Sequence, residues 1–368
     1  MSDAPRIDRL DVAVFKVPTE EPESDGTFTW DATTAVVVQP GAGGATGLGF
    51  TYATGAVKTF IDDLLAPAVI DSDPLDVAGT WSAMVDAIRN MGRPGITSMA
   101  IAAVDTALWD LKAKLLDLPL CRLLGMVRDE VPIYGSGGFT SFTDEELAEQ
   151  LSEWAGGGGM TRVKMKVGTA WGTRPQRDVE RVRVARKAIG DDVELFVDAN
   201  GAYGRKQAVR MARAFAGEGV TWFEEPVSSD DLAGLHEIRG LTDIDVAAGE
   251  YGYDLVYFQR MCAAGAVDVL QSDVSRCAGI TEWLRAGAVA AAHGLALSGH
   301  CAPSLHLHPA CALPNLAHLE YFADHARVER ILFDGVVDPV EGALPPDLRR
   351  PGMGLDLKDV DAERYRTA

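Results

Sequence analysis

Three carboxylates at equal intervals constrain this chain more than any other feature of its sequence. Asp198, Glu224 and Glu250 each end a short apolar, strand-like segment, and consecutive members are 26 residues apart. An interval of this length accommodates one strand, one helix and the two loops that join them, which is the repeating unit of a parallel sheet. A carboxylate at the end of a buried strand is costly unless it has a partner such as a metal ion. Three consecutive strands that end in this way therefore predict a divalent-cation site.

The same alternation of strands and helices extends over most of the chain. From residue 131 onward, strand-like segments alternate with helix-like segments. The expected strands lie near 131–135, 162–167, 194–198, 220–224, 245–249, 267–272, 295–299 and 317–321, and the expected helices near 143–155, 175–189, 204–217, 230–240, 254–264, 279–293 and 303–313. Eight strands separated by seven helices favour a closed (β/α)7β barrel, a modified TIM barrel, because an open sheet of this width is uncommon.

The N-terminal part of the chain has a different pattern. Strand-like alternation at 6–16, 34–39 and 47–52 is followed by helical periodicity at 56–68, 74–91 and 98–116. Strands followed by helices predict an α+β domain. The expected organisation is an α+β capping domain, the barrel, and a C-terminal segment that packs back on the capping domain, at residues 1–125, 126–325 and 326–368.

Charge and composition exclude several classes of partner. The formal charge of −20 opposes binding to nucleic acid or to an anionic membrane. No apolar run of about 18 residues is present, and the N-terminus lacks the basic and apolar segments of a signal peptide. The five cysteines are scattered, which indicates reduced thiols. We therefore expect a cytoplasmic protein without a nucleic-acid or membrane partner.

Ionisable residues recur at the other expected strand ends, where a barrel of this type carries its functional groups. The second strand ends with Lys164 and Lys166, which share one face because they are two residues apart. The last three strands end on Asp273, His300 and Glu320. Seven consecutive strands thus end in an ionisable group, and chance does not explain such regular placement.

With these residues the chain resembles the enolase superfamily, in its mandelate racemase-like subgroup. The resemblance covers most of the chain, including the N-terminal module, the alanine-rich helix at 102–110, the Lys-x-Lys pair, the Asp/Glu/Glu triad and the Asp…His…Glu series. It implies a capped (β/α)7β barrel and Mg²⁺-assisted removal of the proton α to the carboxylate of a small-molecule substrate. Asp198, Glu224 and Glu250 would be the metal ligands, with Glu225 beside them. Mg²⁺ prefers such hard oxygen ligands, and Mn²⁺ is expected to substitute for it.

Each remaining residue at a strand end has an expected role. Lys164 adds positive charge beside the substrate carboxylate. Lys166 is expected to be a base, with its pKa lowered by the second ammonium group and the metal. His300 approaches from the opposite side, and Asp273 accepts a hydrogen bond from its other ring nitrogen. Glu320, if protonated, donates a hydrogen bond to the developing oxyanion.

These residues reduce the number of possible reactions but leave more than one open. A cycloisomerase of the superfamily would carry a lysine where this chain has Asp273 and would lack His300, and the glucarate dehydratase branch would carry Asn in place of Glu250. The commonest outcome that the resemblance implies is dehydration of an acid sugar (aldonate or aldarate) to a 2-keto-3-deoxy acid, and this lyase reaction is the main expectation. The alternative is a racemase or epimerase of a 2-hydroxy acid, in which Lys166 and His300 exchange roles.

Candidate substrate contacts lie outside the expected strands. Asn200 follows the first predicted metal ligand by two residues and faces the same way, with a role in the turn as the alternative. The polar segment 18–31 predicts a mobile loop. Its aromatic residues Phe28 and Trp30, together with Tyr52, are candidates to close over the substrate and exclude water. An equally open alternative packs this loop on a neighbouring subunit, since capped barrels commonly form symmetric homo-oligomers.

Overall fold

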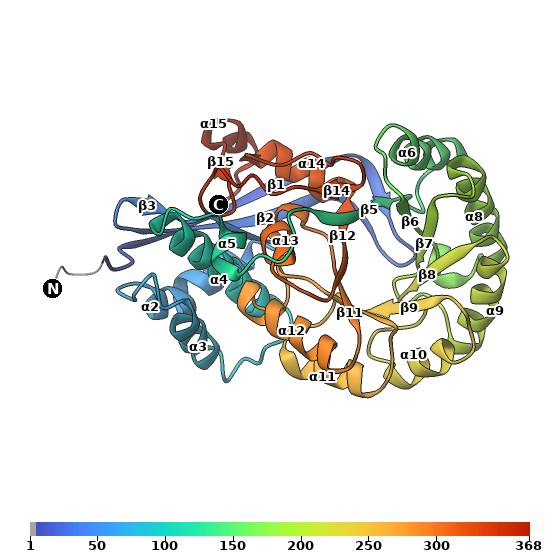
Figure 1. The fold of residues 1–368 in the computed structure, drawn as a ribbon, viewed down its shortest axis with the longest axis horizontal. Coiled ribbons are helices and arrows are strands. Elements are labelled where there is room, and N and C mark those ends of the chain that lie inside the picture. Colours follow the sequence, from blue (N-terminus) through green and yellow to red (C-terminus); the bar gives the residue numbers. More distant parts are fainter. Residues whose placement is uncertain (1–4) are drawn as a thin grey trace.

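An N-terminal α+β domain lies beside a parallel barrel in the computed structural model, which describes residues 5–368 (Figure 1). The N-terminal sheet is antiparallel, and β2 (Thr29–Ala42) pairs with β1 (Arg9–Ser24), β3 (Ala45–Thr46) and β4 (Gly49–Tyr52). The helical elements that follow are α1 (Ala56–Phe60), the π-helical η1 (Ile61–Leu65), α2 (Ala66–Val69), α3 (Val77–Ala87), α4 (Ile96–Leu115) and α5 (Leu120–Leu124). Alternate valines of β1 and β2 are buried against these helices, which explains the period-two pattern of the sequence.

Eight parallel strands close into a barrel, because β12 pairs with β5 as well as with β11. The strands are β5 (Val131–Gly137), β6 (Arg162–Lys166), β7 (Glu194–Asp198), β8 (Val220–Glu224), β9 (Asp245–Ala248), β10 (Val269–Ser272), β11 (Ala296–Gly299) and β12 (Leu316–Phe322). The connecting helices are α6 (Asp144–Gly156), the short α7 (Thr169–Gly172), α8 (Pro175–Ile189), α9 (Arg205–Ala216), α10 (Leu232–Arg239), α11 (Leu255–Ala263), α12 (Ile280–Ala292) and α13 (Pro303–Cys311). The capped barrel expected from the sequence is confirmed.

Aromatic side chains fill the barrel interior beneath the functional strand ends. Tyr134, Phe196 and Trp222 form one buried cluster, in which the rings of Phe196 and Trp222 stack with 5.1 Å between centroids. His318 packs against all three rings, and its Nδ1 lies 3.0 Å from the Ser298 hydroxyl. Burial lowers the pKa of His318 to about 3, so this histidine is neutral. The packed layer leaves one end of the barrel for charged groups.

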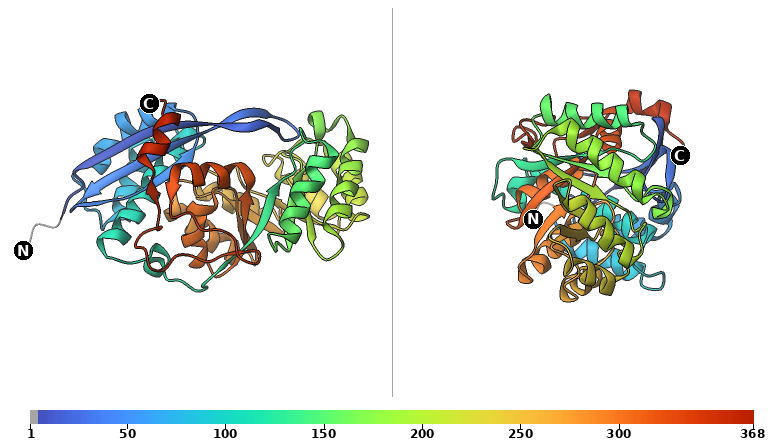
Figure 2. Two further views of the ribbon diagram at one scale, coloured as in Figure 1. Left: turned by 90° about the horizontal axis from the view of Figure 1, so that it is seen from above. Right: turned by 90° about the vertical axis from the view of Figure 1, so that its right-hand side faces the viewer.

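Residues 18–31 form a β-hairpin, so the prediction of an irregular loop is wrong, whereas the expected mobility stays a prediction. β1 and β2 continue into this segment after an irregularity in their register, with Glu23 opposite Trp30 and Ser24 opposite Thr29. The segment is polar because this part of the hairpin projects beyond the rest of the N-terminal sheet. Its side chains there contact solvent and the barrel instead of a hydrophobic core. In the left view of Figure 2 the blue hairpin reaches across to the green helices of the barrel.

The hairpin tip is attached to the loops that follow the barrel strands. Thr140 N donates to Ser24 O at 2.8 Å, and Trp171 N donates to Gly26 O at 2.9 Å. A Cβ atom on Gly26 would lie 2.6 Å from the carbonyl oxygen of Val167, just beyond β6, so this close approach requires glycine. The tip is therefore held over the end of the barrel that carries the charged residues.

Buried polar contacts join α3 and α4 to the barrel and set the position of the N-terminal domain. Asp105 accepts hydrogen bonds from the backbone N of Thr281 at 2.9 Å and from its Oγ1 at 2.6 Å. Trp81 Nε1 donates to Ala278 O at 2.9 Å. A Cβ atom on Gly279 would lie 2.3 Å from Asp105 Oδ2, so glycine is required here too. These contacts orient the cap over the barrel mouth.

The C-terminal part of the chain contacts both domains. It comprises α14 (Ala323–Leu332), β13 (Phe333–Asp334), β14 (Ala343–Leu344), β15 (Asp356–Leu357), α15 (Asp359–Ala362) and the 3-10 turn η2 (Glu363–Tyr365). β14 pairs with β5, and Thr367 N donates to Val14 O at 2.8 Å. The exact domain boundaries stay a prediction. Within residues 5–368, no helix is both long and apolar enough to cross a membrane.

Candidate active site

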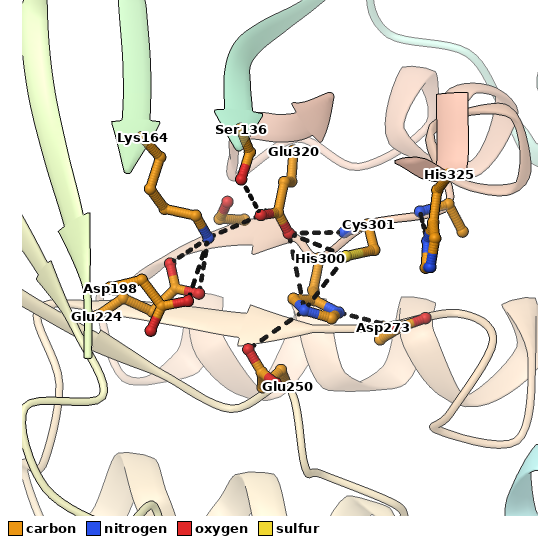
Figure 3. A network of polar contacts seen from close by, with 12 residues as sticks. Ser136, Lys164, Asp198, Glu224, Glu250, Asp273, His300, Cys301, Glu320 and His325 are labelled. Atoms are coloured by element: carbon orange, nitrogen blue, oxygen red, sulfur yellow. Dashed lines mark hydrogen bonds and ion pairs between the residues drawn. The ribbon is translucent and has the colours of Figure 1, made fainter. Parts of the chain in front are cut away.

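Two lysines of β6 point toward the centre of the barrel mouth, as alternate positions on a strand do (Figure 3 shows Lys164). Lys164 is fully buried, and its Nζ lies 2.7 Å from both carboxylate oxygens of Glu224 and 2.8 Å from Glu320 Oε1. Lys166 Nζ contacts Asp198 Oδ2. Both ammonium groups are thus paired with carboxylates, which offsets the cost of burying them.

Asp198, Glu224 and Glu250 converge on one point. One oxygen of each carboxylate lies within 4.8 Å of the others, and all three residues are buried. Asp198 and Glu224 are partners at the ends of β7 and β8, whereas Glu250 lies two residues beyond β9. Gly249 makes this extension possible with a φ of 137°, because a Cβ atom there would lie 2.1 Å from the carbonyl oxygen of Gln271.

The three carboxylates fit a magnesium ion. Glu250 Oε2 is buried and has no hydrogen-bond donor within residues 5–368, although His300 Nε2 lies 3.2 Å away. Burial and the neighbouring Asp198 raise the pKa of Glu224, so a cation between these carboxylates would relieve repulsion. Three hard oxygen donors beside an open cavity suit Mg²⁺. Asp198, Glu224 and Glu250 would hold the ion, which would stabilise negative charge on a bound carboxylate.

His300 approaches the cavity from the other side of the barrel. It follows β11, which is separated from β6 by β5 and β12. His300 Nδ1 lies 2.8 Å from Asp273 Oδ2, and a carboxylate acceptor assigns the proton to that nitrogen (Figure 3). Burial disfavours the imidazolium form, but the nearby carboxylates of Glu250 and Glu320 outweigh burial and raise the pKa of His300. Nε2 is left to act on a substrate.

The surroundings of Lys166 and Glu320 bear on the charge states that the sequence predicts for these two residues. Burial would lower the pKa of Lys166, but Asp198 and other carboxylates outweigh burial and raise it. The expected lowering depends on the metal ion as well as on the second ammonium group, so it stays a prediction. Burial would raise the pKa of Glu320, but Lys164 and His300 outweigh it and lower the pKa. This direction opposes the condition under which Glu320 is expected to donate a hydrogen bond, namely a protonated carboxyl group.

The contacts of Glu320 agree with an ionised carboxylate. Ser136 Oγ donates to its Oε1 at 2.6 Å, and the backbone N of Cys301 donates to its Oε2 at 2.9 Å. Lys164 provides a third donor. β12 also continues two residues beyond Glu320, so this side chain points into the barrel from within the strand and not from its end. A carboxylate with three donors holds Lys164 and the 300–301 backbone in place.

A cavity of 560 Å³ lies between the hairpin, β4 and the barrel ends. Its size lies within the range of small-molecule sites. Lys166, Glu250, Asp273 and His300 line it on the barrel side, whereas Lys164 is buried below. The structure thus brings candidate bases, a candidate metal ligand and open space together.

All four predicted substrate contacts line this cavity. Phe28 is 66% exposed and stacks on Trp30, whose ring contacts Phe139 edge-on at 5.5 Å. Tyr52 stacks on the ring of His325 with 3.6 Å between centroids. Asn200 has a φ of 45°, and its buried Oδ1 has no hydrogen-bond partner within the described residues, so it combines a turn conformation with a free acceptor.

Sequence reasoning missed Arg276, His325 and Cys301, which also line the cavity. Arg276 follows Asp273 by three residues, and this spacing beyond a strand end was the available signal. His325 had no such signal, because it reaches the cavity through α14 and its stacking on Tyr52. Cys301 lies beside His300 and Glu320, but burial raises its thiol pKa to about 12, which makes it a poor metal ligand.

A barrel with this cap, an acidic triad and basic groups on two sides of one cavity has the architecture of the enolase superfamily, whose enzymes remove a proton next to a carboxylate. The chain belongs to the mandelate racemase / muconate lactonizing enzyme family within it. The family model of the N-terminal domain matches residues 9–125, and the model described as enolase C-terminal domain-like matches residues 146–362.

Individual relatives cover nearly the whole chain. A mandelate racemase/muconate lactonizing enzyme-like protein from Rubrobacter xylanophilus has a crystal structure with a TM-score of 0.95 and 51% identity, over 98% of this chain and 100% of that one. A 3,6-anhydro-alpha-L-galactonate cycloisomerase from Streptomyces coelicolor is 32% identical over 95% of this chain and 97% of its own.

A third relative, the L-talarate/galactarate dehydratase of Salmonella typhimurium, is 34% identical over 76% of this chain and 70% of its own. Its crystal structure liganded with Mg and L-lyxarohydroxamate has a TM-score of 0.91 and 28% identity, over 99% of this chain and 94% of that one. Dehydration of acid sugars and magnesium binding thus both occur among the relatives.

Proposed function

We propose that this protein is a Mg²⁺-dependent acid sugar dehydratase that converts an aldonate or aldarate to a 2-keto-3-deoxy acid. The observation that carries this proposal is that Lys166 and His300 line one cavity from different sides of the barrel, and that Glu250 lines the same cavity. Dehydration needs a base at C2 and an acid at the C3 hydroxyl group, and two such groups are present. Dehydratase relatives support the same reaction.

The residues divide the work as follows. Asp198, Glu224 and Glu250 would hold the Mg²⁺ ion, which would supply positive charge to stabilise the substrate carboxylate. Lys164 adds a second positive charge there. Lys166 or His300 takes the C2 proton, and the other group protonates the C3 hydroxyl, which leaves as water. The resulting enol takes up a proton at C3 and loses the proton of its C2 hydroxyl group, which gives the 2-keto-3-deoxy acid.

His300 needs Asp273 to act as an acid or base, because the 2.8 Å contact between its Nδ1 and Asp273 Oδ2 fixes the ring orientation and the tautomer. The hairpin tip, held over this end of the barrel, would exclude water from a bound substrate. For Lys166, release of the Asp198 contact on metal binding would free the amine to exchange protons.

A racemase or epimerase is the second candidate, favoured by the same two-sided arrangement of Lys166 and His300. A cycloisomerase is a third, favoured by the 32% identity to the Streptomyces coelicolor enzyme, although His300 and Asp273 stand against the residues expected for that branch.

One experiment separates these reactions. A library of sugar acids is incubated with the protein and Mg²⁺ in D₂O, and 2-keto acid formation and deuterium at C2 are measured separately. Keto acid from a narrow stereochemical set is expected. Deuterium at C2 without keto acid would show a racemase or epimerase, and ring opening of a lactone or anhydro sugar acid without water loss would show a cycloisomerase. Lys166→Ala and His300→Asn should each lose the activity, whereas the exposed His293→Asn should retain it.

A further inference from the structure

We infer that the substrate is a monocarboxylate with an uncharged, hydroxylated chain, and that Asp25 selects it against the corresponding dicarboxylate. The inference rests on the proposed function and narrows its substrate class from aldonates and aldarates to aldonates. Its basis is the uneven distribution of charge along the 560 Å³ cavity.

Positive charge is confined to the barrel side of the cavity. Within residues 5–368, Lys166 and Arg276 are the lysine and arginine side chains that line it. Lys166 contacts Asp198, and Arg276 lies between Glu250 and Asp273, at 3.2 and 3.6 Å. Both cations therefore stand at the metal-binding end, where the reacting carboxylate belongs.

The wall formed by the hairpin and β4 carries the opposite charge. Among the described residues of the N-terminal domain that line the cavity, Asp25 is the only charged side chain. Its Oδ1 accepts hydrogen bonds from Thr27 N at 2.5 Å, Thr27 Oγ1 at 2.9 Å and Phe28 N at 2.8 Å. These bonds fix the carboxylate at the hairpin tip, so it does not turn away from a bound substrate.

The surroundings of this wall add no free positive charge, and Glu23 on the same hairpin is mostly protonated near pH 7. Glu23 accepts from Trp30 Nε1 at 2.9 Å, and burial together with the nearby Asp324 raises the pKa of Glu23 to about 8. Arg327 is the neighbouring cation, but its Nη2 already lies 2.6 Å from Asp324 Oδ1. A second substrate carboxylate would thus meet like charge without a free cation, and like charges at an interface oppose binding.

The rest of the wall suits a hydroxylated chain. Hydroxyl groups of Thr27, Thr34 and Thr54 line the cavity beside aromatic rings. Burial lowers the pKa of His325 to about 4, so the ring stacked on Tyr52 is neutral. Hydroxyl groups can pair with the threonines, and C–H edges can lie on the aromatic rings, so an uncharged sugar chain finds partners that a carboxylate does not.

The first test compares aldonates with aldarates of the same length and configuration. Keto acid formation with Mg²⁺ is measured, and binding to Lys166→Ala is measured by calorimetry, which needs no turnover. The aldonate is expected to have at least a tenfold higher kcat/KM and a lower Kd. An aldarate that equals or exceeds it in both would overturn the inference but leave a dehydratase. Selective aldonate binding by Lys166→Ala, with no keto acid formed by the unaltered protein from any acid, would support the inference and refute the dehydratase.

The second test concerns Asp25 itself. Asp25→Asn keeps the Oδ1 acceptor and removes the charge, so the hairpin tip is expected to keep its structure. The ratio of aldarate to aldonate kcat/KM should rise at least fivefold. Asp31→Asn is the matched control, because Asp31 is exposed on the same hairpin and does not line the cavity. Thr54→Lys, which adds a cation to the wall, should raise the ratio as well, and equal ratios in all variants would overturn the role of Asp25.

Discussion

Arg276 Nη1 lies 3.2 Å from Glu250 Oε1, while the other oxygen of Glu250 has no hydrogen-bond donor within residues 5–368. The same guanidinium lies 3.6 Å from Asp273 Oδ2 and stands over the ring of Tyr251. Arg276 thus holds one oxygen of a candidate metal ligand, and the second oxygen, 3.2 Å from His300 Nε2, would be available to the ion. It also connects that ligand to the carboxylate that orients His300.

Arg276→Lys should weaken Mg²⁺ binding by about 10- to 100-fold, because groups that orient metal ligands have effects of this size. A lysine carries the charge but does not bridge two carboxylates with a planar fork. Calorimetric titration of Mg²⁺ without substrate checks this prediction. Arg285→Lys is the matched control, since Arg285 pairs with Glu282 away from the cavity. An unchanged Mg²⁺ affinity with a raised substrate KM would instead place Arg276 in substrate binding.

Asp273→Asn should lower kcat by about 10² to 10⁴, the usual range for loss of an oriented acid or base. The amide no longer selects the His300 tautomer with a proton on Nδ1. Steady-state kinetics should show the loss in kcat, and the Mg²⁺ affinity should change much less than in Arg276→Lys. A variant with unchanged kcat would show that His300 does not need this carboxylate.

Phe28→Ala should raise the substrate KM on the order of tenfold, because burial of a phenylalanine ring against a ligand contributes about 1.5–3 kcal/mol. Its effect on the free energy of unfolding should stay within about 0.5 kcal/mol, since Phe28 is 66% exposed. Initial rates and denaturant unfolding measure the two quantities. Val360→Ala, at a 90% exposed apolar residue outside the cavity, should change neither. A large loss of stability with no change in KM would mean that Phe28 supports the hairpin and does not contact substrate.

Asp105 should make the folded protein less stable as the pH rises from about 4 to about 7. Burial raises its pKa to about 7, although the Thr281 hydrogen bonds oppose this rise. The contribution of a raised acid pKa is fully present below the ordinary value of 3.8 and is lost as the pH rises through the folded value. Asp105→Asn should remove this dependence, so its stability relative to the original protein should increase over that range. Denaturant midpoints at pH 4, 5.5 and 7 test this, and parallel profiles would contradict it.

Much of the fold follows from local patterns in the sequence. Strand and helix periodicities locate the barrel, because each strand or helix must bury one or both of its faces whatever residues it packs against. The hairpin at 18–31 could not be predicted in this way. Its two strands pair with each other outside the hydrophobic core, and its tip is held by contacts with the barrel. Polar composition does not distinguish such a hairpin from a loop.

The sequence alone determined where the carboxylates Asp198, Glu224 and Glu250 would meet, since equal spacing on parallel strands brings their ends to one edge. Only the tertiary structure decided which carboxylate pairs with Lys166, which donors surround Glu320, and that Asp25 lines the cavity on the wall away from Lys166 and Arg276. The reason is physical: a charge responds to its distance from other charges and to burial. Those distances join residues far apart in the chain.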